Sequence, residues 1–355
     1  MLYLAPNLGD DRSLSMKLYL DDLVSAFSVI GFTDFRIIVP PTIGNPGRFR
    51  IQWERYVTFP KLISKTLARE DRLHVIDHSY GHLCAAQPKS TVTCHDIAEY
   101  RLTELRGYQL ALWKKRVRDM RHASLITAIS SNTKHDIIDL LGIPDERVVV
   151  NHYGHDTRFS PATVDKMQVW DAFGLSDEFA RGAYMILHVG SNIHRKNIPV
   201  LLSAIAILKR SGMDVCLVKV GDRLSESKFL GMIRSLGISD CVKDLGSLSL
   251  DQLLTVYRAV HAFSFPSTYE GFGRPILEAQ GCGCPSVIAS SSCLAEVGGD
   301  GSLYHDPVDS EGLASQLRNI LTDPETSASL REKGLRNVKR FSWEKHARLL
   351  LETLS

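Results

Sequence analysis

A cationic loop is the first segment of this 355-residue chain in which residue type and spacing point to chemistry. It runs from Gly190 to Asn197 and holds Arg195 and Lys196 side by side, between the apolar run 184–189 and a helical pattern. Backbone N–H groups at a helix N-terminus favour an anion, and adjacent cations strengthen that preference. The loop therefore predicts a phosphate site, although a solvated basic helix start would carry the same residues. Its spacing is not the G-x4-G-K-[ST] pattern of a Walker nucleoside triphosphatase.

A second loop carries two carboxylates, Glu270 and Glu278, in an E-x7-E arrangement. The glycines of the 271–273 turn allow the backbone to approach a ligand, and Pro275 suits the first position of a helix. Carboxylates beside a helix N-terminus can bind hydroxyl groups while the free N–H groups hold a phosphate. This combination favours a sugar attached to a diphosphate. The alternative is structural, with glutamates that complement the helix dipole and glycines that make a turn.

Two loops in the first half of the chain are further candidates. His95 follows the apolar run 91–94, and a histidine after a buried strand can donate a hydrogen bond to a hydroxyl or to a developing charge. The same residue could equally be a structural histidine. The opening loop, residues 6–13, follows the first expected strand and is a candidate for the side of the site that would bind an acceptor substrate.

No motif in the sequence indicates a metal centre. His74, His78 and His82 have only Asp77 as an acidic neighbour at a ligand spacing, and the chain has no Asp-x-Asp triplet. The seven cysteines include no CxxC pair, which disfavours a zinc site and a disulfide framework. We therefore expect a reaction that needs neither a metal nor a cofactor.

The elements that position these loops follow from the hydrophobic pattern. Apolar, β-branched runs alternate with helical patterns, which predicts an α/β protein with parallel sheets covered on both faces. Residues 159–183 lose this alternation and are expected to connect two successive sheets. We expect a first domain at 1–165 on the acceptor side, a second at 166–340, and a C-terminal helix at 341–355 that packs back on the first. Ligands of such sheets bind beyond the carboxyl ends of the strands, where the candidate loops lie.

Charge and hydropathy limit the partners. Lys and Arg number 42 against 40 Asp and Glu, without the basic excess typical of proteins that bind nucleic acid. Residues 101–121 concentrate seven cations against two carboxylates, as in a solvated helix face or a surface that contacts anionic lipid or a pyrophosphate-linked acceptor. No apolar run reaches the roughly 18 residues of a membrane span, and the N-terminus has no signal-peptide pattern. We expect a cytoplasmic protein, at most peripheral at the inner face of the membrane.

Together, these motifs resemble the retaining glycosyltransferases of family 4, which have the GT-B fold. The resemblance rests on the E-x7-E motif with its G-F-G-x-P segment and on Gly190 followed by the Arg-Lys-Asn triplet 195–197. It also rests on segments 151–161, 220–222, 294–299 and 341–343. It covers the second domain throughout and the first in patches. It implies two Rossmann-like domains that face each other across a cleft, with C-terminal helices.

The resemblance implies a role for each candidate residue, with a nucleotide-diphosphate sugar held mostly by the second domain. Arg195 and Lys196 would neutralise the diphosphate, Glu278 would bind the ribose, and Leu248 would lie near the base. Glu270 and the backbone of 271–273 would hold the transferred sugar. The implied catalytic residues are Glu270, His95, Lys196 and Arg195. The implied nucleotide-sugar contacts are Gly190, Arg195, Lys196, Leu248, Glu270, Gly271, Phe272, Gly273 and Glu278.

Three positions depart from the family pattern. Ser191 stands where an arginine often follows the glycine, and Arg195 would take its place, as in a mannosyltransferase-like branch with the Arg-Lys-Asn form. Arg274 stands where a bulky apolar residue is common, and the opening loop has Ser-Leu-Ser-Met at 13–16 in place of a glycine-rich sequence.

The resemblance implies transfer of a hexose from GDP-mannose or a UDP-sugar to a glycan or lipid-linked acceptor, in the biosynthesis of a cell-surface polysaccharide. Anomeric configuration would be retained, with the leaving phosphate as the base and no protein nucleophile. Two alternatives stay open. One is another GT-B activity, a sugar phosphorylase or an epimerase. The other is a non-catalytic protein that binds a nucleotide or a glycan.

Overall fold

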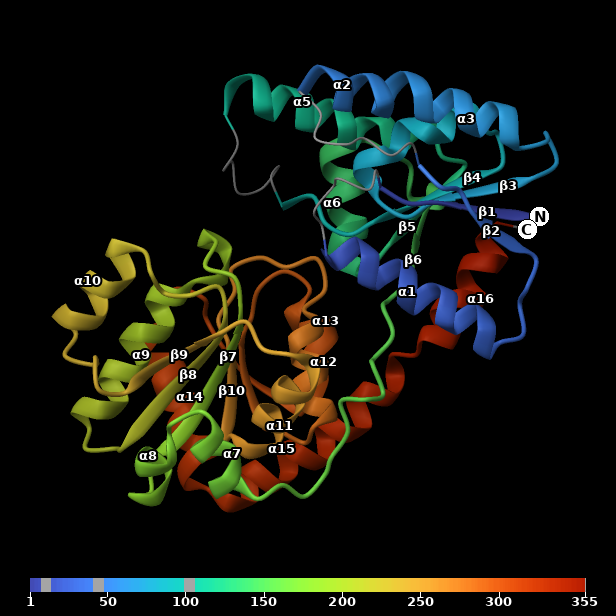
Figure 1. Ribbon diagram of the computed structural model, residues 1–355. Helices are drawn as coiled ribbons and strands as arrows, with labels where there is room; N and C mark the ends of the chain where they lie inside the picture. The colour runs from blue at the N-terminus through green and yellow to red at the C-terminus, as the bar shows by residue number, and fades with distance from the viewer. Residues whose placement is uncertain (8–13, 41–47, 99–105, 355) are drawn as a thin grey trace. The chain divides into compact units, whose positions relative to one another are not determined.

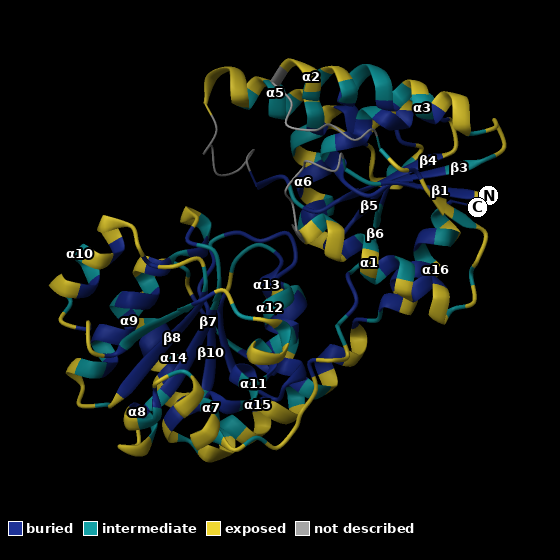
Figure 2. Cartoon of the chain, viewed as in Figure 1, coloured by how far each residue is buried: buried dark blue, intermediate teal, exposed yellow. Residues whose placement is uncertain are grey.

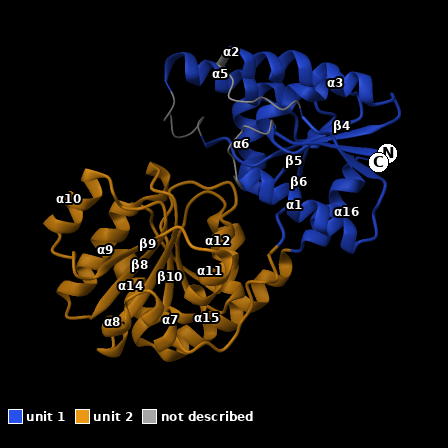
Figure 3. Ribbon diagram, in the orientation of Figure 1, with its two compact units in different colours: residues 1–154, 342–355 blue, residues 155–341 orange. Residues whose placement is uncertain are grey.

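The chain folds into two compact units, described in a computed structural model that covers residues 1–7, 14–40, 48–98 and 106–354 (Figure 1). The first unit comprises residues 1–154 and 342–355, and the second comprises residues 155–341 (Figure 3). Each unit holds one six-stranded parallel sheet flanked by helices. The alternating strand and helix pattern of the sequence predicted this α/β architecture, and the prediction is confirmed.

The sheet of the first unit has the strand order β2-β1-β3-β4-β5-β6. Its four inner strands are largely buried, as expected for a parallel sheet with both faces covered, whereas the edge strands β2 and β6 are less so (Figure 2). The strands are β1 (Leu2–Ala5), β2 (Phe35–Ile37), β3 (Arg72–Val75), β4 (Ser90–Cys94), β5 (Leu125–Ala128) and β6 (Val148–Val150). The main helices are α1 (Leu14–Val29), α2 (Arg48–Trp53), α3 (Phe59–Thr66), α5 (Gly107–Arg118), α6 (Ser131–Leu141) and α16 (Trp343–Thr353). Shorter turns are η1 (Glu54–Thr58), η2 (His78–Ala86), η3 (Asp119–His122) and η4 (Asp145–Arg147).

The sheet of the second unit has the strand order β12-β11-β10-β7-β8-β9, so the chain enters it at a central strand. From β7 it builds outward to β9, then returns to the other side of β7 with β10. The strand order therefore reverses between β7 and β10, which makes a topological switch point. The strands are β7 (Tyr184–Gly190), β8 (Val215–Gly221), β9 (Val242–Gly246), β10 (Ala262–Phe265), β11 (Ser286–Ala289) and β12 (Ser302–His305).

Helices cover the sheet of the second unit, and α9, α12 and α13 begin at the loops that follow β7, β10 and β11. They are α7 (Lys166–Ala172), α8 (Ser176–Ala180), α9 (Ile198–Arg210), α10 (Ser227–Ser235), α11 (Leu250–Ala259), α12 (Arg274–Gly281), α13 (Leu294–Gly298), α14 (Ser310–Thr322) and α15 (Pro324–Asn337). Turns η5 (His194–Lys196), η6 (Gly299–Gly301) and η7 (Val338–Arg340) complete it. The α9 helix packs its apolar face, including Leu201, Leu202 and Ile205, into the core of this unit.

The segment 155–165 packs within the second unit, whereas the sequence analysis placed it in the first domain. The Phe159 ring meets the Tyr257 ring edge-on, with centroids 5.7 Å apart. The Arg258 side chain donates a hydrogen bond to the Ser160 carbonyl at 2.9 Å. These contacts come from residues about 100 positions downstream, which the local sequence pattern does not reveal.

The α16 helix belongs to the first unit, where it packs against α1. His346 on α16 hydrogen-bonds the His152 carbonyl through Nδ1 at 2.9 Å and the Tyr19 hydroxyl through Nε2 at 3.1 Å. Gly154 lies so close to Trp343 that a Cβ atom at this position would be 2.3 Å from the indole. The last helix is therefore an integral part of the first unit's core.

Neither a membrane span nor a metal cluster is found in the part of the chain that the structure describes. None of the helices described combines the length and hydropathy needed to cross a bilayer. No group of three or more His, Cys, Asp or Glu side chains in these ranges is placed to hold a metal ion. All seven cysteines are buried free thiols and pack in the interior.

Candidate functional site

The candidate site lies at the carboxyl ends of β7 and β10, where the strand order of the second unit reverses. These two strands pair in parallel, so the loops that follow them, 191–197 and 266–273, are neighbours. The Thr268 N–H donates a hydrogen bond to the Arg195 carbonyl at 2.8 Å, which ties the two loops together. The fold thus brings the cationic loop and the first half of the E-x7-E motif to one place.

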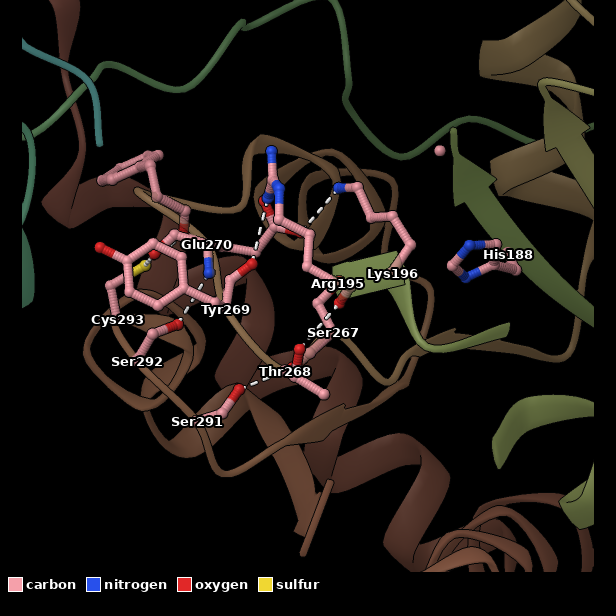
Figure 4. A network of polar contacts seen from close by, with 12 residues as sticks. His188, Arg195, Lys196, Ser267, Thr268, Tyr269, Glu270, Ser291, Ser292 and Cys293 are labelled. Atoms are coloured by element: carbon pink, nitrogen blue, oxygen red, sulfur yellow. Dashed lines mark hydrogen bonds and ion pairs between the residues drawn. The ribbon is translucent and has the colours of Figure 1, made fainter. Parts of the chain in front are cut away.

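Two cations of the first loop bind one carboxylate of the second, as Figure 4 shows. Lys196 Nζ lies 2.7 Å from Glu270 Oε1, and the Arg195 guanidinium contacts Oε2 of the same carboxylate. Lys196 is 9% exposed and Glu270 6%. Burial alone would raise the pKa of Glu270, but Lys196 and Arg195 hold this pKa below its usual range. Glu270 is therefore ionised at neutral pH, and the cluster carries one positive charge in excess.

Asn197 fixes the turn that presents the two cations. It adopts the left-handed conformation with φ of 55°, which asparagine tolerates better than most residues. Its side-chain amide donates to the Pro266 carbonyl at 3.1 Å and to the Pro307 carbonyl at 2.6 Å. The ammonium of Lys196 also lies 4.6 Å from the centre of the Phe265 ring, a favourable cation–π distance. The Arg-Lys-Asn triplet is therefore two cations that share Glu270, followed by the residue that fixes their turn.

The loop after β11 holds the Glu270 backbone. The Glu270 N–H donates to Ser292 Oγ at 2.9 Å. The Cys293 thiol lies 3.1 Å from the Glu270 carbonyl and 3.2 Å from the Phe272 carbonyl. Sequence reasoning missed Ser292 and Cys293, because only the completed sheet brings the loop after β11 next to the loop after β10.

Gly273 and Phe272 have structural reasons for their identity. Gly273 has φ of 99° at the start of α12, and a Cβ atom there would lie 3.1 Å from the side chains of Ile276 and Leu294. The buried Phe272 ring packs edge-on against Phe341, with centroids 5.6 Å apart. Both residues shape the turn, so its backbone, rather than the phenyl ring, is what a ligand can contact.

Glu278 sits one turn inside α12 and differs from Glu270 in its surroundings. The Tyr257 hydroxyl donates to Glu278 Oε2 at 3.0 Å. Burial raises the pKa of Glu278, and the opposing effects of Arg274 and Tyr257 do not cancel this rise. The pKa values of the two carboxylates of this motif are thus shifted in opposite directions. Two cations balance the charge of Glu270, whereas the Glu278 oxygens can still accept hydrogen bonds from hydroxyl groups.

His188, in the middle of β7, is a buried residue of the site that sequence reasoning missed. Its Nδ1 lies 3.0 Å from the Ser264 carbonyl, so Nδ1 carries the proton and Nε2 is an acceptor. Burial lowers its pKa to about 3, with a smaller contribution from Lys219. A Cβ atom at Gly190 would lie 3.7 Å from His188 Nε2 and 3.5 Å from Lys196 Cε, so Gly190 keeps this space open.

Lys219 in β8 is a second missed residue, and it fixes the end of β7. Its ammonium donates to the Gly190 carbonyl at 2.6 Å and to the Asp222 carbonyl at 3.0 Å. Burial lowers its pKa to about 8. Gly221 allows the close approach, because a Cβ atom there would lie 2.3 Å from the Gly190 oxygen. An ionisable residue inside an apolar strand pattern is the signal that could have identified both His188 and Lys219.

Leu248 is not brought to the cation cluster by any described contact. It follows β9, the edge strand that β8 separates from β7, and its side chain is half-buried. The structure therefore groups Gly190, Arg195, Lys196, Glu270 and the 271–273 turn, with Glu278 one helical turn away. Leu248 stands on a separate loop at the same edge of the sheet.

His95 lies in the first unit, directly after β4. Its Nε2 is 2.6 Å from the Ile76 carbonyl, so Nε2 carries the proton, and its Nδ1 contacts the Tyr153 hydroxyl. Burial lowers the pKa of His95 to about 4, although Asp77 acts in the opposite direction. The ring is therefore neutral at pH 7, and both nitrogens have protein partners, which favours the structural interpretation of this histidine.

Two sequence candidates fall partly outside the described residues. Residues 8–13 of the opening loop do so, as do residues 101–105 of the cationic segment. The rest of that segment forms α5 and η3, where Lys114, Lys115, Arg118 and Arg121 line one pocket together with a single carboxylate, Asp119.

Both units match known families. Residues 176–337 match the model described as glycosyl transferases group 1, and residues 23–159 match that of glycosyltransferase family 4. The chain is 30% identical to the O-antigen chain mannosyltransferase B of Escherichia coli over 72% of this chain and 67% of that protein. It is 28% identical to the serotype-specific mannosyltransferase WbdA of Escherichia coli over 99% of this chain and 43% of that protein. The chain thus spans less than half the length of this second relative.

Solved structures of glycosyltransferases share the fold. The Anabaena protein HepE in complex with UDP-glucose superposes with a TM-score of 0.77 at 20% identity, covering 100% of this chain and 99% of that one. WaaG, a glycosyltransferase involved in lipopolysaccharide biosynthesis, gives a TM-score of 0.76 at 15% identity, covering both chains completely. The two α/β units, each with one parallel sheet, and the match to these structures identify the fold as GT-B. This chain belongs to glycosyltransferase family 4, as its motifs implied.

Proposed function

We propose that this protein is a retaining mannosyltransferase that moves mannose from GDP-mannose to a glycan or lipid-linked acceptor of a cell-surface polysaccharide. The observation that carries the proposal is the buried cluster in which Arg195 and Lys196 share Glu270. The names of the two Escherichia coli relatives support mannose as the sugar. A UDP-sugar is the second candidate donor, supported by the complex of the HepE fold relative with UDP-glucose.

The cluster suggests how a diphosphate would be bound. Phosphate oxygens would replace the Glu270 carboxylate as partners of Arg195 and Lys196, because the pair carries one charge more than Glu270 neutralises. Glu270 would then be free to accept hydrogen bonds from hydroxyl groups of the transferred sugar. Glu278, with a single described hydrogen-bond partner, would accept them from the ribose.

Bond making and breaking follow from this placement. The bond between the anomeric carbon and the diphosphate oxygen breaks, and Arg195 and Lys196 stabilise the negative charge that develops on the leaving group. The acceptor hydroxyl forms the new bond on the same face and gives its proton to the departing diphosphate. Because Glu270 would accept hydrogen bonds from the sugar hydroxyls, we assign it no role as a nucleophile, and retention by way of the leaving phosphate fits this site. The reaction needs no metal or other cofactor to balance.

In the proposed reaction, His95 is a neutral imidazole held in a fixed orientation. A sugar hydroxyl that contacts it would take the place of Tyr153 or the Ile76 carbonyl at the ring. Because burial lowers its pKa to about 4, His95 would act by hydrogen bonding and not as a cation at neutral pH.

We also propose that the enzyme is cytoplasmic and contacts the inner face of the membrane through its first unit. The cations of α5 and η3 outnumber their one carboxylate, and α2 exposes Phe49 by 81% and Trp53 by 52%. Cations with exposed aromatic rings suit an anionic lipid surface. Co-sedimentation with anionic vesicles, but not with zwitterionic ones, is the expected result. No binding to either kind of vesicle would contradict this contact.

A thermal-shift screen with GDP, UDP, ADP and their sugars tests the donor. A ligand that binds only the folded protein raises its melting temperature, so GDP and GDP-mannose should give the largest shifts. If a UDP-sugar gave a larger rise in melting temperature than GDP-mannose, the donor would be the UDP-sugar. Supplying free phosphate and finding release of a sugar 1-phosphate would identify a phosphorylase instead.

A further inference from the structure

A second cationic pocket lies in the second unit, at the far end of α12 from Glu270. It is lined by the connecting segment 161–164 together with Lys166, Arg258, Cys282 and Arg331. Its volume is about 430 Å³, within the range of small-molecule pockets. The eight residues of α12 separate it from the start of that helix by about 12 Å, so it is distinct from the candidate donor site.

Three cations and no carboxylate line this pocket. Among the residues described, no carboxylate lies within 4.0 Å of Lys166, Arg258 or Arg331. Other cations of the same unit do have such partners, for example Arg181 with Asp214 at 2.8 Å. The pKa of Lys166 lies below its usual range because of burial and because of the positive charge of Arg331. Lys166 and Arg331 therefore repel each other, and no carboxylate of the described residues pairs with either of them.

Arg258 is held in place before any ligand binds. Arg258 Nε donates to the Ser160 carbonyl at 2.9 Å and Nη2 to the Arg158 carbonyl at 3.3 Å. A guanidinium has five N–H donors, so these two hydrogen bonds leave donors of Arg258 for a ligand. The side chain of Arg331 runs along the Gly283 turn, where a Cβ atom would lie 3.4 Å from its Cγ. A ligand would thus meet a partly preorganised set of donors.

The positions of these cations are only partly explained by the helices that carry them. Arg258 is in the last turn of α11, where a cation complements the helix dipole. Lys166, in contrast, is the first residue of α7, where the dipole disfavours a positive charge. Arg331 lies in the middle of α15. The neutral Cys282 thiol, whose pKa burial raises to about 12, offers no compensating charge.

We propose that this pocket binds a small phosphate-bearing anion, of the size of pyrophosphate or a sugar phosphate, independently of the donor site. The anion compensates the positive charges of Lys166, Arg258 and Arg331. It also joins the connecting segment 161–164 to α11, α12 and α15. Binding therefore stabilises the second unit and fixes the stretch of chain that leads into it.

Calorimetric titration with pyrophosphate tests the proposal on the full-length chain. Wild type should bind pyrophosphate at two sites, and Lys196→Ala should retain the one at Arg331. Arg331→Glu should weaken that one by about tenfold or more, because it replaces a charge-assisted partner by a like charge to the ligand. Arg331→Glu should also keep the wild-type thermal shift with the nucleotide that the screen identifies.

Arg336→Glu is the matched control, because it makes the same charge change on the same helix at an exposed residue that pairs with Glu332 and does not line the pocket. Lys166→Gln is a second, milder variant and should weaken pyrophosphate binding in the same direction as Arg331→Glu. Equal affinities in wild type, Arg331→Glu and Lys166→Gln would overturn the proposal. So would equal losses in Arg331→Glu and Arg336→Glu, since these would show a general effect of charge. Loss of all pyrophosphate binding in Lys196→Ala would assign the anion to the donor site alone.

Discussion

Two glutamates of one motif illustrate how neighbours decide a residue's role. Glu270 and Glu278 are chemically identical and have seven residues between them, and the sequence could predict that both face a ligand. It could not predict that two cations lower the pKa of Glu270 while burial raises the pKa of Glu278. The difference comes from Lys196 and Arg195, which reach Glu270 only after β7 and β10 have packed side by side.

Substitutions at Lys196 and Glu278 should separate transfer from binding. Lys196→Ala should reduce transfer by about 100-fold or more, because it removes a cation that stabilises the leaving group. Glu278→Ala should weaken nucleotide binding by about tenfold, because it removes a charged hydrogen-bond acceptor. Transfer rates and nucleotide Kd values of the purified variants are the measurements.

Lys209→Ala is the matched control, since Lys209 pairs with Asp240 on the surface of the same unit. It should leave both quantities unchanged. Wild-type transfer rates in both site variants would refute the assigned roles of Lys196 and Glu278.

At the scale of elements, the sequence predicted all six strands of the first sheet and the four inner strands of the second, but missed the two edge strands of the second. The central strands read as continuous apolar runs because both faces of the sheet are covered. The edge strands β9 and β12 are half-exposed and contain polar residues, so neither gives such a run. The helical stretch 48–66 was also missed. Its pattern is interrupted by a π-helical turn at 54–58, in which Arg55 is buried and its guanidinium lies 3.8 Å from the centre of the Tyr80 ring.

The docking of α16 depends on a glycine. Gly154→Ala should destabilise the first unit by about 1–3 kcal/mol, because its new methyl group would overlap Trp343. Gly231→Ala is the matched control. It lies inside α10 with no atom within 4 Å of the new methyl group, so it should stabilise the protein by up to about 1 kcal/mol. Urea unfolding of both variants measures the two effects, and equal midpoints would contradict the packing described here.

At the scale of the whole molecule, the net charge of +2 conceals where the charges act. The cations to which we assign ligand binding or membrane contact lie at 195–196, on α5 and η3, and around the pocket between α11, α12 and α15. The sequence pointed to the first two groups, because their members are close together in the chain. Lys166, Arg258 and Arg331 are far apart in sequence, so only the folded unit reveals the third group.

Buried neutral histidines make the whole protein sensitive to acid. Burial lowers the pKa values of six of them to between about 3 and 4, against about 6.5 in an unfolded chain. These residues are His74, His82, His95, His188, His261 and His346. As the pH falls from 6.5 toward 4, the unfolded chain takes up protons that the native state does not, so stability is lost over this window. Thermal unfolding at pH 7, 6 and 5 should show a falling melting temperature, and a constant one would contradict the buried neutral state.

The return of the chain to the first unit has a consequence for its synthesis. Residues 1–154 leave the ribosome first, but α16 follows only after the whole second unit has been made. At typical translation speeds, residues 155–341 take roughly 10–40 s. During this interval Tyr19 and Gly154 lack the side chains of His346 and Trp343 that cover them in the finished fold. Synthesis of the second unit is therefore completed before synthesis of the first. Until α16 has been made, the nascent first unit presents an uncovered apolar face on which chaperones can act.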